Sequence, residues 1–165
     1  MKKRVGVYAG SFDPPTCGHL WVIERGLELF NELIVAVGTN QEKSYTFPLE
    51  KRMAMLEETL TGHRRARVAA AQDRLLVRYA KEQGAEYMIR GLRSAEDYEY
   101  EHAMWNINHG IEPGVQTIFI PPPPELASVS SSMVKELAQC KEWRELRKYV
   151  PAPVLKALKE HFKQR

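Results

Sequence analysis

The chain has 165 residues, of which 44% are hydrophobic and 27% charged, and its formal net charge is only +3. These proportions are typical of a soluble globular protein, and because no apolar run approaches the roughly 20 residues of a membrane span, we expect no membrane association. So weak a positive charge does not require a nucleic-acid partner, and we expect none. The two cysteines, Cys17 and Cys140, lack metal-ligand spacing and fit a reducing compartment, so we expect a cytoplasmic protein forming one domain over residues 1–165.

Short apolar runs alternate with helical patterns along the whole chain. Strands are predicted where a run of apolar residues ends at glycine or polar residues, and helices where apolar residues recur every three or four positions. The predicted strands are 5–9, 33–37, 68–71, 87–89 and 115–120, and the predicted helices are 19–30, 48–60, 75–80, 95–109, a helix following Ser130–Ser132, 143–149 and 153–162.

Prolines and a glycine add predictions about the local backbone. Pro48 suits the first position of a helix, and Gly84 suits a left-handed cap at the end of one. The four prolines from Pro121 to Pro124 are expected to form an extended connector, because proline cannot pair inside a sheet.

The alternation of strands and helices predicts the fold class α/β. We expect a single Rossmann-like, doubly wound domain with a five-stranded parallel sheet, right-handed crossovers, helices on both faces and further helices at the C-terminus. Ligands bind such sheets at the carboxyl ends of the strands, where the strand order reverses. Chemistry-bearing residues follow the first, fourth and fifth strands, in segments 10–19, 90–93 and 130–132. If the first and fourth strands are neighbours, these segments face one crevice.

The segment GSFDPPTCGHL at 10–20 connects the first strand to a helix. Free backbone N–H groups at the start of a helix favour a bound anion, and phosphate is the natural one. Neither GxxxxGK nor GxGxxG occurs, which excludes the P-loop and the dinucleotide-binding turn. Gly10 and Gly18 are expected to allow close approach to the backbone, and His19 to offer a hydrogen-bond donor to the anion. We assign Cys17 to the turn and give it no catalytic role.

With these motifs, the chain resembles the HxGH-type nucleotidyltransferases, with Thr16 in place of the first histidine. It is similar in particular to the bacterial phosphopantetheine adenylyltransferases. The likeness covers nearly the whole length and is carried by GSFDPPTCGHL, Lys43, IRGLR at 89–93, DYEYE at 97–101 and SVSSSMVKE at 128–136. The combination of RGLR with DYEYE is far more specific than the TxGH element.

The resemblance implies transfer of the adenylyl group of ATP to 4′-phosphopantetheine, with dephospho-coenzyme A and pyrophosphate as products. It makes His19 the group that stabilises the transition state, assisted by Lys43 and Arg93. Ser11, Lys43 and Arg90 would bind the acceptor phosphate, with Leu75 and Leu76 against the pantetheine arm. The implied ATP-binding residues are Ser11, Phe12, His19, Gly91, Leu92, Arg93, Glu101, Leu126, Ala127, Ser128, Val129, Ser130, Ser131 and Ser132.

The resemblance also implies Mg²⁺ carried by ATP, feedback binding of coenzyme A and a homohexamer. We expect no protein metal site, because His102 and His109 share a helix face without a third ligand. The stretch LASVSSS at 126–132 departs from relatives, which usually carry a bulky aromatic residue before the serines. We therefore expect adenine packing and feedback by coenzyme A to differ from those of the relatives, whereas ATP binding, which depends largely on backbone contacts in them, should be retained.

Three other functions fit parts of the sequence. GSFDPP also opens many nicotinamide or nicotinate mononucleotide adenylyltransferases, although RGLR, DYEYE and Thr16 favour the phosphopantetheine enzymes. A regulatory module would bind ATP without releasing pyrophosphate. An RNA-binding surface built on Arg64, Arg65 and Arg67 would bind polyanions with a strong salt dependence.

Overall fold

Five parallel strands form one sheet at the centre of the computed structural model, which describes residues 3–40, 42–71 and 74–163. The strand order is β3-β2-β1-β4-β5, so the order reverses between the adjacent strands β1 and β4. The predicted neighbours are therefore confirmed, and the segments following β1, β4 and β5 meet at one edge. The strands are β1 (Val5–Gly10), β2 (Glu32–Gly38), β3 (Ala66–Ala71), β4 (Tyr87–Gly91) and β5 (Gln116–Ile120).

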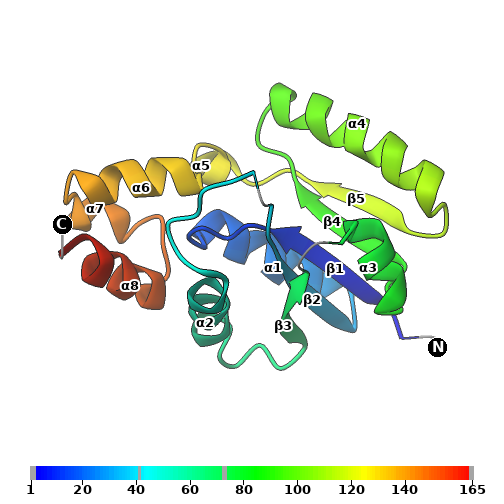
Figure 1. Cartoon of the computed structure of the whole chain (residues 1–165), viewed down its shortest axis with the longest axis horizontal. Coiled ribbons are helices and arrows are strands. Elements are labelled where there is room, and N and C mark those ends of the chain that lie inside the picture. Colours follow the sequence, from blue (N-terminus) through cyan, green and yellow to red (C-terminus); the bar gives the residue numbers. More distant parts are fainter. Residues whose placement is uncertain (1–2, 41, 72–73, 164–165) are drawn as a thin grey trace.

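Helices connect the strands and continue beyond the sheet at the C-terminal end (Figure 1). None of those in the described ranges is long and apolar enough to cross a membrane. The helices are α1 (Cys17–Leu29), α2 (Leu49–Thr59), α3 (Leu76–Glu82), α4 (Ala95–Ile111), α5 (Pro124–Ala127), α6 (Ser131–Gln139), α7 (Trp143–Leu146) and α8 (Ala152–Lys163).

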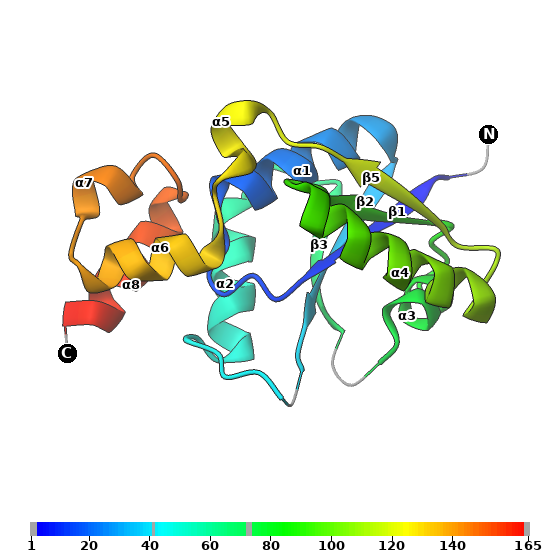
Figure 2. The ribbon, with the colours of Figure 1, turned by 90° about the horizontal axis from the view of Figure 1, so that it is seen from above.

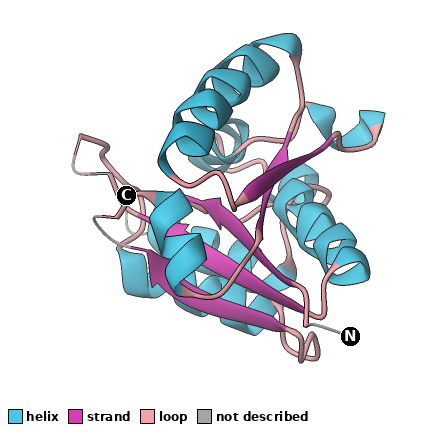
Figure 3. Ribbon diagram, turned by 90° about the vertical axis from the view of Figure 1, so that its right-hand side faces the viewer, coloured by secondary structure: helices cyan, strands magenta, loops and turns pink. Residues whose placement is uncertain are grey.

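Both faces of the sheet are covered by helices, as the sequence predicted (Figure 3). Side chains alternate between the faces along β1: Tyr8 packs with residues of α1 and α2, whereas Val7 and Ala9 pack with residues of α3. Because strands buried on both faces need apolar side chains on both, the core of the sheet reads as continuous apolar runs in the sequence.

A separate apolar cluster joins α2 to the C-terminal helices. Its fully buried members include Val134 of α6, Leu146 of α7, and Val154 and Leu158 of α8. These helices lie at the opposite end of the molecule from α3 and α4 (Figure 2). The C-terminal helices and the helices α3 and α4 therefore form two differently packed halves, and the cavity of the candidate active site lies between them.

Several boundaries differ from those predicted, for local reasons. Helix α1 begins at Cys17, two residues before the predicted start, because Thr16 caps it by accepting a hydrogen bond from the backbone N–H of His19. Pro48 is the residue before α2, and Pro124 begins α5, so only the first three prolines of the connector are extended. Gly84 has a φ of +70°, which confirms the predicted left-handed cap.

Candidate active site

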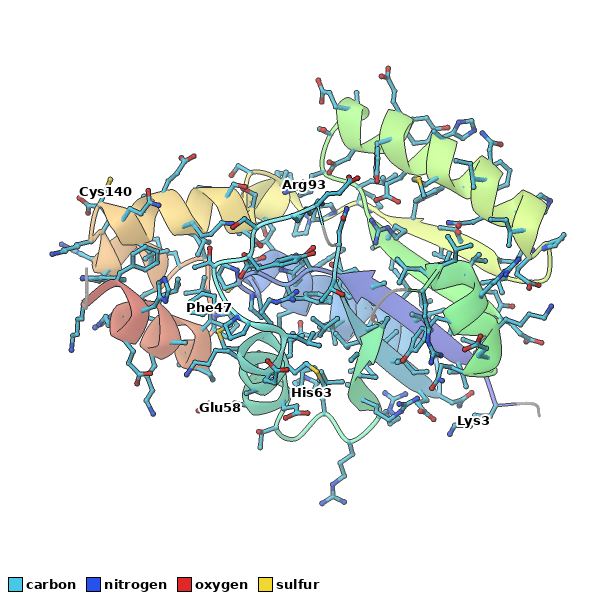
Figure 4. All side chains as sticks on the ribbon, in the orientation of Figure 1. Lys3, Phe47, Glu58, His63, Arg93 and Cys140 are labelled. Carbon is cyan, nitrogen blue, oxygen red and sulfur yellow. The ribbon has the colours of Figure 1, made fainter. Side chains whose placement is uncertain are left out.

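A cavity of about 500 Å³ lies at the carboxyl ends of β1 and β4. It brings together the segments that follow β1, β4 and β5, so the predicted crevice is present. Figure 4 shows the side chains around it, with Arg93 labelled beside the chain that leads to α5, and Cys140 far away at the end of α6. The predicted site residues that line the cavity are Ser11, His19, Lys43, Arg90, Gly91, Arg93, Glu101, Leu126, Val129, Ser130, Ser131 and Ser132.

The turn between β1 and α1 is shaped by a buried aromatic ring. Phe12 has a φ of +49°, in the left-handed region, and its side chain is 1% exposed. Its ring packs edge-on against Tyr8 and His19, with centroid distances of 5.4 and 5.0 Å. A Cβ atom on Gly10 would come within 3.1 Å of this ring. The glycine therefore makes room for Phe12. Gly10 also lines the cavity, and its predicted role in the close approach of a ligand stays a prediction.

His19 is fixed by a reciprocal cap at the start of α1. Its Nδ1 accepts a hydrogen bond of 2.9 Å from the backbone N–H of Thr16, while the Thr16 hydroxyl accepts one of 3.3 Å from the backbone N–H of His19. Since a backbone N–H can only donate, Nδ1 carries no proton, and the proton of the neutral imidazole is on Nε2. The ring can thus offer an Nε2–H donor to the cavity.

The charge state of His19 follows from its surroundings. Burial, together with the charges of Arg93 and Arg90, lowers its pKa to about 4. The imidazole is therefore neutral near pH 7 and acts as a neutral donor. Nearby, burial raises the pKa of Tyr8 to about 12, although the two arginines oppose the shift, so its phenol keeps its proton.

The loop between β2 and α2 brings Lys43 to the cavity. Lys43 is exposed, and its ammonium has no hydrogen-bond or ion-pair partner within the described ranges. Asp13, buried in the turn after β1, accepts hydrogen bonds of 2.8 and 2.9 Å from the backbone N–H groups of Thr46 and Phe47. This carboxylate ties the loop to the turn and leaves the lysine free to bind an anion.

Arg90 and Glu101 form a bidentate ion pair across the floor of the cavity. The guanidinium donates to both carboxylate oxygens, through Nε at 2.8 Å and through Nη2, and its Nη1 donates to the Ala9 carbonyl at 2.7 Å. Burial lowers the pKa of Arg90, but the hydrogen bond and charge of Glu101 outweigh this and raise it. Glu101 therefore holds the arginine in place as well as lining the cavity.

Arg93 reaches from the end of β4 across to the segment before α6. Its Nε donates to Asp97 at 3.0 Å, and its Nη1 lies 3.5 Å from the Val129 carbonyl. Ser130 caps α6 by accepting a hydrogen bond from the N–H of Met133. The first N–H groups of α6 have no partner within the helix, and they are suited to binding phosphate together with Arg93.

A second, apolar pocket of about 100 Å³ adjoins the main cavity. It shares Ala9, Arg90 and Glu101 with the main cavity, and its wall includes Leu76 and Trp105. A ligand whose phosphate lies near Arg90 can therefore extend an apolar chain into this pocket. Leu75, the other predicted leucine, is 52% exposed and lines neither cavity.

Four other predicted residues do not line the main cavity: Phe12, Leu92, Ala127 and Ser128. Conversely, sequence reasoning missed Tyr8, Tyr45, Asp97 and Lys135, all of which line it. Lys135 could have been found from the sequence, since it lies one helical turn after Ser131 and so on the same face of α6. Tyr8 could not, because a buried run does not reveal which of its residues faces a site.

The carboxylates of the cavity are already paired. Asp13 accepts two backbone N–H groups and lies 3.5 Å from the Lys135 ammonium, Asp97 pairs with Arg93, and Glu101 pairs with Arg90. Among the described residues, no group of three potential metal ligands occurs.

Cys17 shows no sign of a nucleophile. Its side chain does not line the cavity, and burial, with the nearby Glu24, raises its pKa, so the thiol stays protonated near pH 7.

A parallel sheet with a turn suited to binding an anion after its first strand, and a neutral histidine at the first helix, is typical of a nucleotidyltransferase domain. A family profile described as cytidylyltransferase-like matches residues 7–137. The fold is also similar to that of Plasmodium falciparum nicotinic acid mononucleotide adenylyltransferase complexed with NaAD, with a TM-score of 0.74, 16% identity, and coverage of 98% of this chain and 96% of that one. At that identity the likeness supports the fold alone.

Sequence relatives identify the family within this class. A phosphopantetheine adenylyltransferase of Chromobacterium violaceum is 48% identical, covering 96% of each chain. One from Lacticaseibacillus paracasei is 37% identical, covering 96% of this chain and 93% of its own. The chain belongs to the phosphopantetheine adenylyltransferase family, which confirms the resemblance found in the sequence.

Proposed function

We propose that this chain transfers the adenylyl group of ATP to 4′-phosphopantetheine, releasing pyrophosphate and dephospho-coenzyme A. The observation that carries the choice of acceptor is the apolar pocket that shares Arg90 with the main cavity. A phosphate ester with a long, flexible arm matches a cationic cavity that opens into a narrow apolar one. A mononucleotide, with its phosphate close to a ribose and a planar ring, does not need such a pocket.

The acceptor phosphate is the nucleophile in this proposal. Its second pKa is about 6, so it is largely dianionic at neutral pH and no residue has to remove a proton. Lys43, whose ammonium has no partner among the described residues, and Arg90 neutralise its charge, and the hydroxyl of Ser11 completes its binding site. Catalysis then depends on in-line positioning and on hydrogen-bond donors at the reacting phosphate.

His19 supplies the donor at the α-phosphate of ATP. Its Nε2–H is fixed by the hydrogen bond from Thr16 to Nδ1, so the ring does not have to change tautomer or orientation during the reaction. Arg93 and the first turn of α6 bind the β- and γ-phosphates and stabilise the charge that develops on departing pyrophosphate. To do so, Arg93 leaves its ion pair with Asp97 and binds the phosphates instead.

Mg²⁺ enters bound to the phosphates of ATP. The paired carboxylates of Asp13, Asp97 and Glu101 support this role, since they leave phosphate oxygens as its main ligands. A cytoplasmic location and feedback binding of coenzyme A, whose pantetheine arm matches that of the acceptor, belong to the same proposal.

We also propose that identical chains assemble, as a homohexamer, through the face formed by α4. This helix has no buried residue, and Tyr98, Tyr100 and Ile107 are between 49% and 64% exposed. Apolar surface of this kind is stabilised when another subunit covers it. Ile107→Asp should dissociate the assembly in analytical ultracentrifugation, and an unchanged sedimentation coefficient would remove α4 from the interface.

The reaction is tested by pyrophosphate release from MgATP with a panel of acceptors: phosphopantetheine, pantetheine, nicotinamide mononucleotide and nicotinate mononucleotide. We expect release with phosphopantetheine alone. Pantetheine is the matched control, because it has the same arm without the nucleophilic phosphate. Pyrophosphate release only with a mononucleotide would show that the proposed acceptor is wrong. ATP binding without pyrophosphate release in the presence of any acceptor would favour a regulatory module.

A further inference from the structure

A buried arginine lies behind the cavity, and the proposed mechanism does not use it. Arg52 of α2 is 1% exposed, and it is the largest of the fully buried side chains. Burying a guanidinium is costly unless its donors are satisfied by hydrogen bonds. Arg52 does not line the cavity, so its guanidinium can act on a ligand only through the protein groups that it contacts.

Arg52 donates to the backbone of three separate segments. Its Nη1 donates to the Ser11 carbonyl at 2.6 Å and to the Gly38 carbonyl at 3.1 Å, and its Nε donates to the Phe47 carbonyl at 3.1 Å. These carbonyls belong to the turn after β1, to the end of β2, and to the last part of the loop that carries Lys43. One side chain therefore connects the phosphate-binding turn with the acceptor loop.

The same loop is held from its other side. Asp13 accepts a hydrogen bond of 2.9 Å from the backbone N–H of Phe47, and Arg52 donates one to the carbonyl of the same residue. Both backbone groups of Phe47 therefore have charged partners. The ring of Tyr45 lies over the guanidinium, 4.1 Å from ring centroid to Cζ. Tyr45 lines the cavity, so its position beside Lys43 depends on the arginine beneath it.

We propose that Arg52 is a positioning residue for the acceptor phosphate. It fixes the distance between Ser11 and the loop of Lys43, so that both contact the phosphate without a prior rearrangement. This inference rests on the proposed function, in which these two residues bind the acceptor. Lysine cannot replace Arg52, because only the planar guanidinium reaches three carbonyls with donors of fixed geometry.

Kinetics of Arg52→Lys test this role. We expect the KM for phosphopantetheine to rise about tenfold, the effect of losing one or two hydrogen bonds from a charged group, while the KM for ATP changes less than about threefold. The matched control is Leu60→Ala, two helical turns further along, at the residue that ends α2. Leu60 is 6% exposed and packs in the apolar cluster beneath the sheet, which contains neither Tyr45 nor Phe47, so this variant is destabilised without losing contacts to the loop.

Limited trypsin digestion tests the same role without catalysis. The bond after Lys43 is exposed, and we expect its cleavage in Arg52→Lys to be about tenfold faster than in the wild type. Leu60→Ala should be cleaved there at the wild-type rate. If Arg52→Lys does not fold, Tyr45→Leu provides the second variant, with an expected acceleration that is smaller but measurable.

Two outcomes would overturn the inference. The first is an unchanged acceptor KM together with wild-type cleavage after Lys43 in the Arg52 variant. The second is the same change in both properties in Leu60→Ala, which would reduce Arg52 to a general stabiliser of the fold. If the wild-type enzyme fails to use phosphopantetheine, the proposed function fails, and the cleavage rates alone decide whether Arg52 orders the loop.

Discussion

Arg52 and Asp13, on the α2 side of the cavity, are buried and bound to the backbone, whereas Arg93 and Asp97, at the start of α4, are bound to each other near the surface. Arg52 and Asp13 are 1% and 5% exposed, and they hydrogen-bond to backbone groups of the turn and the loop. The side chains of Arg93 and Asp97 are 42% and 27% exposed and form an ion pair between residues four apart. Backbone contacts fix a loop, but exposed ion pairs are weak and readily exchanged.

The surrounding apolar packing differs in the same way. Helix α2 packs into the C-terminal cluster, in which Leu146, Val154 and Leu158 are completely buried. Helix α4 has no buried residue, and its stacked Tyr98, His102 and Trp105 rings lie along its surface. The α2 side is therefore suited to hold the acceptor phosphate and the transition state in a fixed geometry, whereas the exposed pair of Arg93 and Asp97 can adapt to the phosphates of ATP.

The difference in packing predicts the largest effect, which is on stability. Leu158→Ala removes a side chain with no exposed surface and should lower the free energy of unfolding by about 3 kcal/mol. Glu99→Ala, at an exposed position of α4, should change it by less than about 0.5 kcal/mol. Urea denaturation of both variants checks this, and equal losses would show that the two halves do not differ in packing.

The fixed geometry of His19 predicts the largest catalytic effect. His19→Ala should lower kcat by about 100-fold or more, because one preorganised donor to the transition state is lost. Pyrophosphate release at saturating substrates measures this. His102→Ala, in the aromatic stack of α4, is the control and should keep kcat within about twofold. Near-normal turnover in His19→Ala would remove the histidine from the reaction.

The division between acceptor and ATP predicts a split in KM. Lys43→Ala should raise the KM for phosphopantetheine at least about tenfold, the effect of one lost charge-assisted hydrogen bond, with little change in the KM for ATP. Arg93→Ala should do the reverse. Titration of each substrate at saturation of the other checks both variants. Identical changes in the two KM values would contradict the division of the cavity into two sides.

The lowered pKa of His19 predicts a smaller effect, on stability in acid. The folded protein keeps the imidazole neutral down to about pH 4, while the unfolded chain binds a proton near pH 6.5. The contribution of neutral His19 to the free energy of unfolding is therefore fully present above pH 6.5. Below pH 6.5 the free energy of unfolding decreases as the pH falls, by about 1 kcal/mol at pH 5.5. His19→Ala should lose less stability over this interval in urea titrations. Equal losses would show that another group is responsible.

The sequence predicted the order of the strands and helices, apart from the short helix α5, and the edge of the sheet that holds the site, because apolar periodicity and the motifs after the strands are local signals. It did not predict the partners of the charged residues. Arg52 lies on the apolar face of α2, which indicates that it is buried. The apolar periodicity does not show which groups its guanidinium contacts. The cap between Thr16 and His19 could have been recognised, since histidine here occupies the position where a capping box has glutamate.

A competition between two acceptors shows which of them the cavity selects. The wild-type enzyme is given MgATP with equal concentrations of phosphopantetheine and nicotinate mononucleotide, and the products are separated and identified by mass spectrometry. We expect the apolar pocket beside Arg90 to accept the pantetheine arm and not the mononucleotide. Dephospho-coenzyme A should therefore form almost exclusively. Formation of the dinucleotide in comparable or greater amount would contradict the assignment of the acceptor.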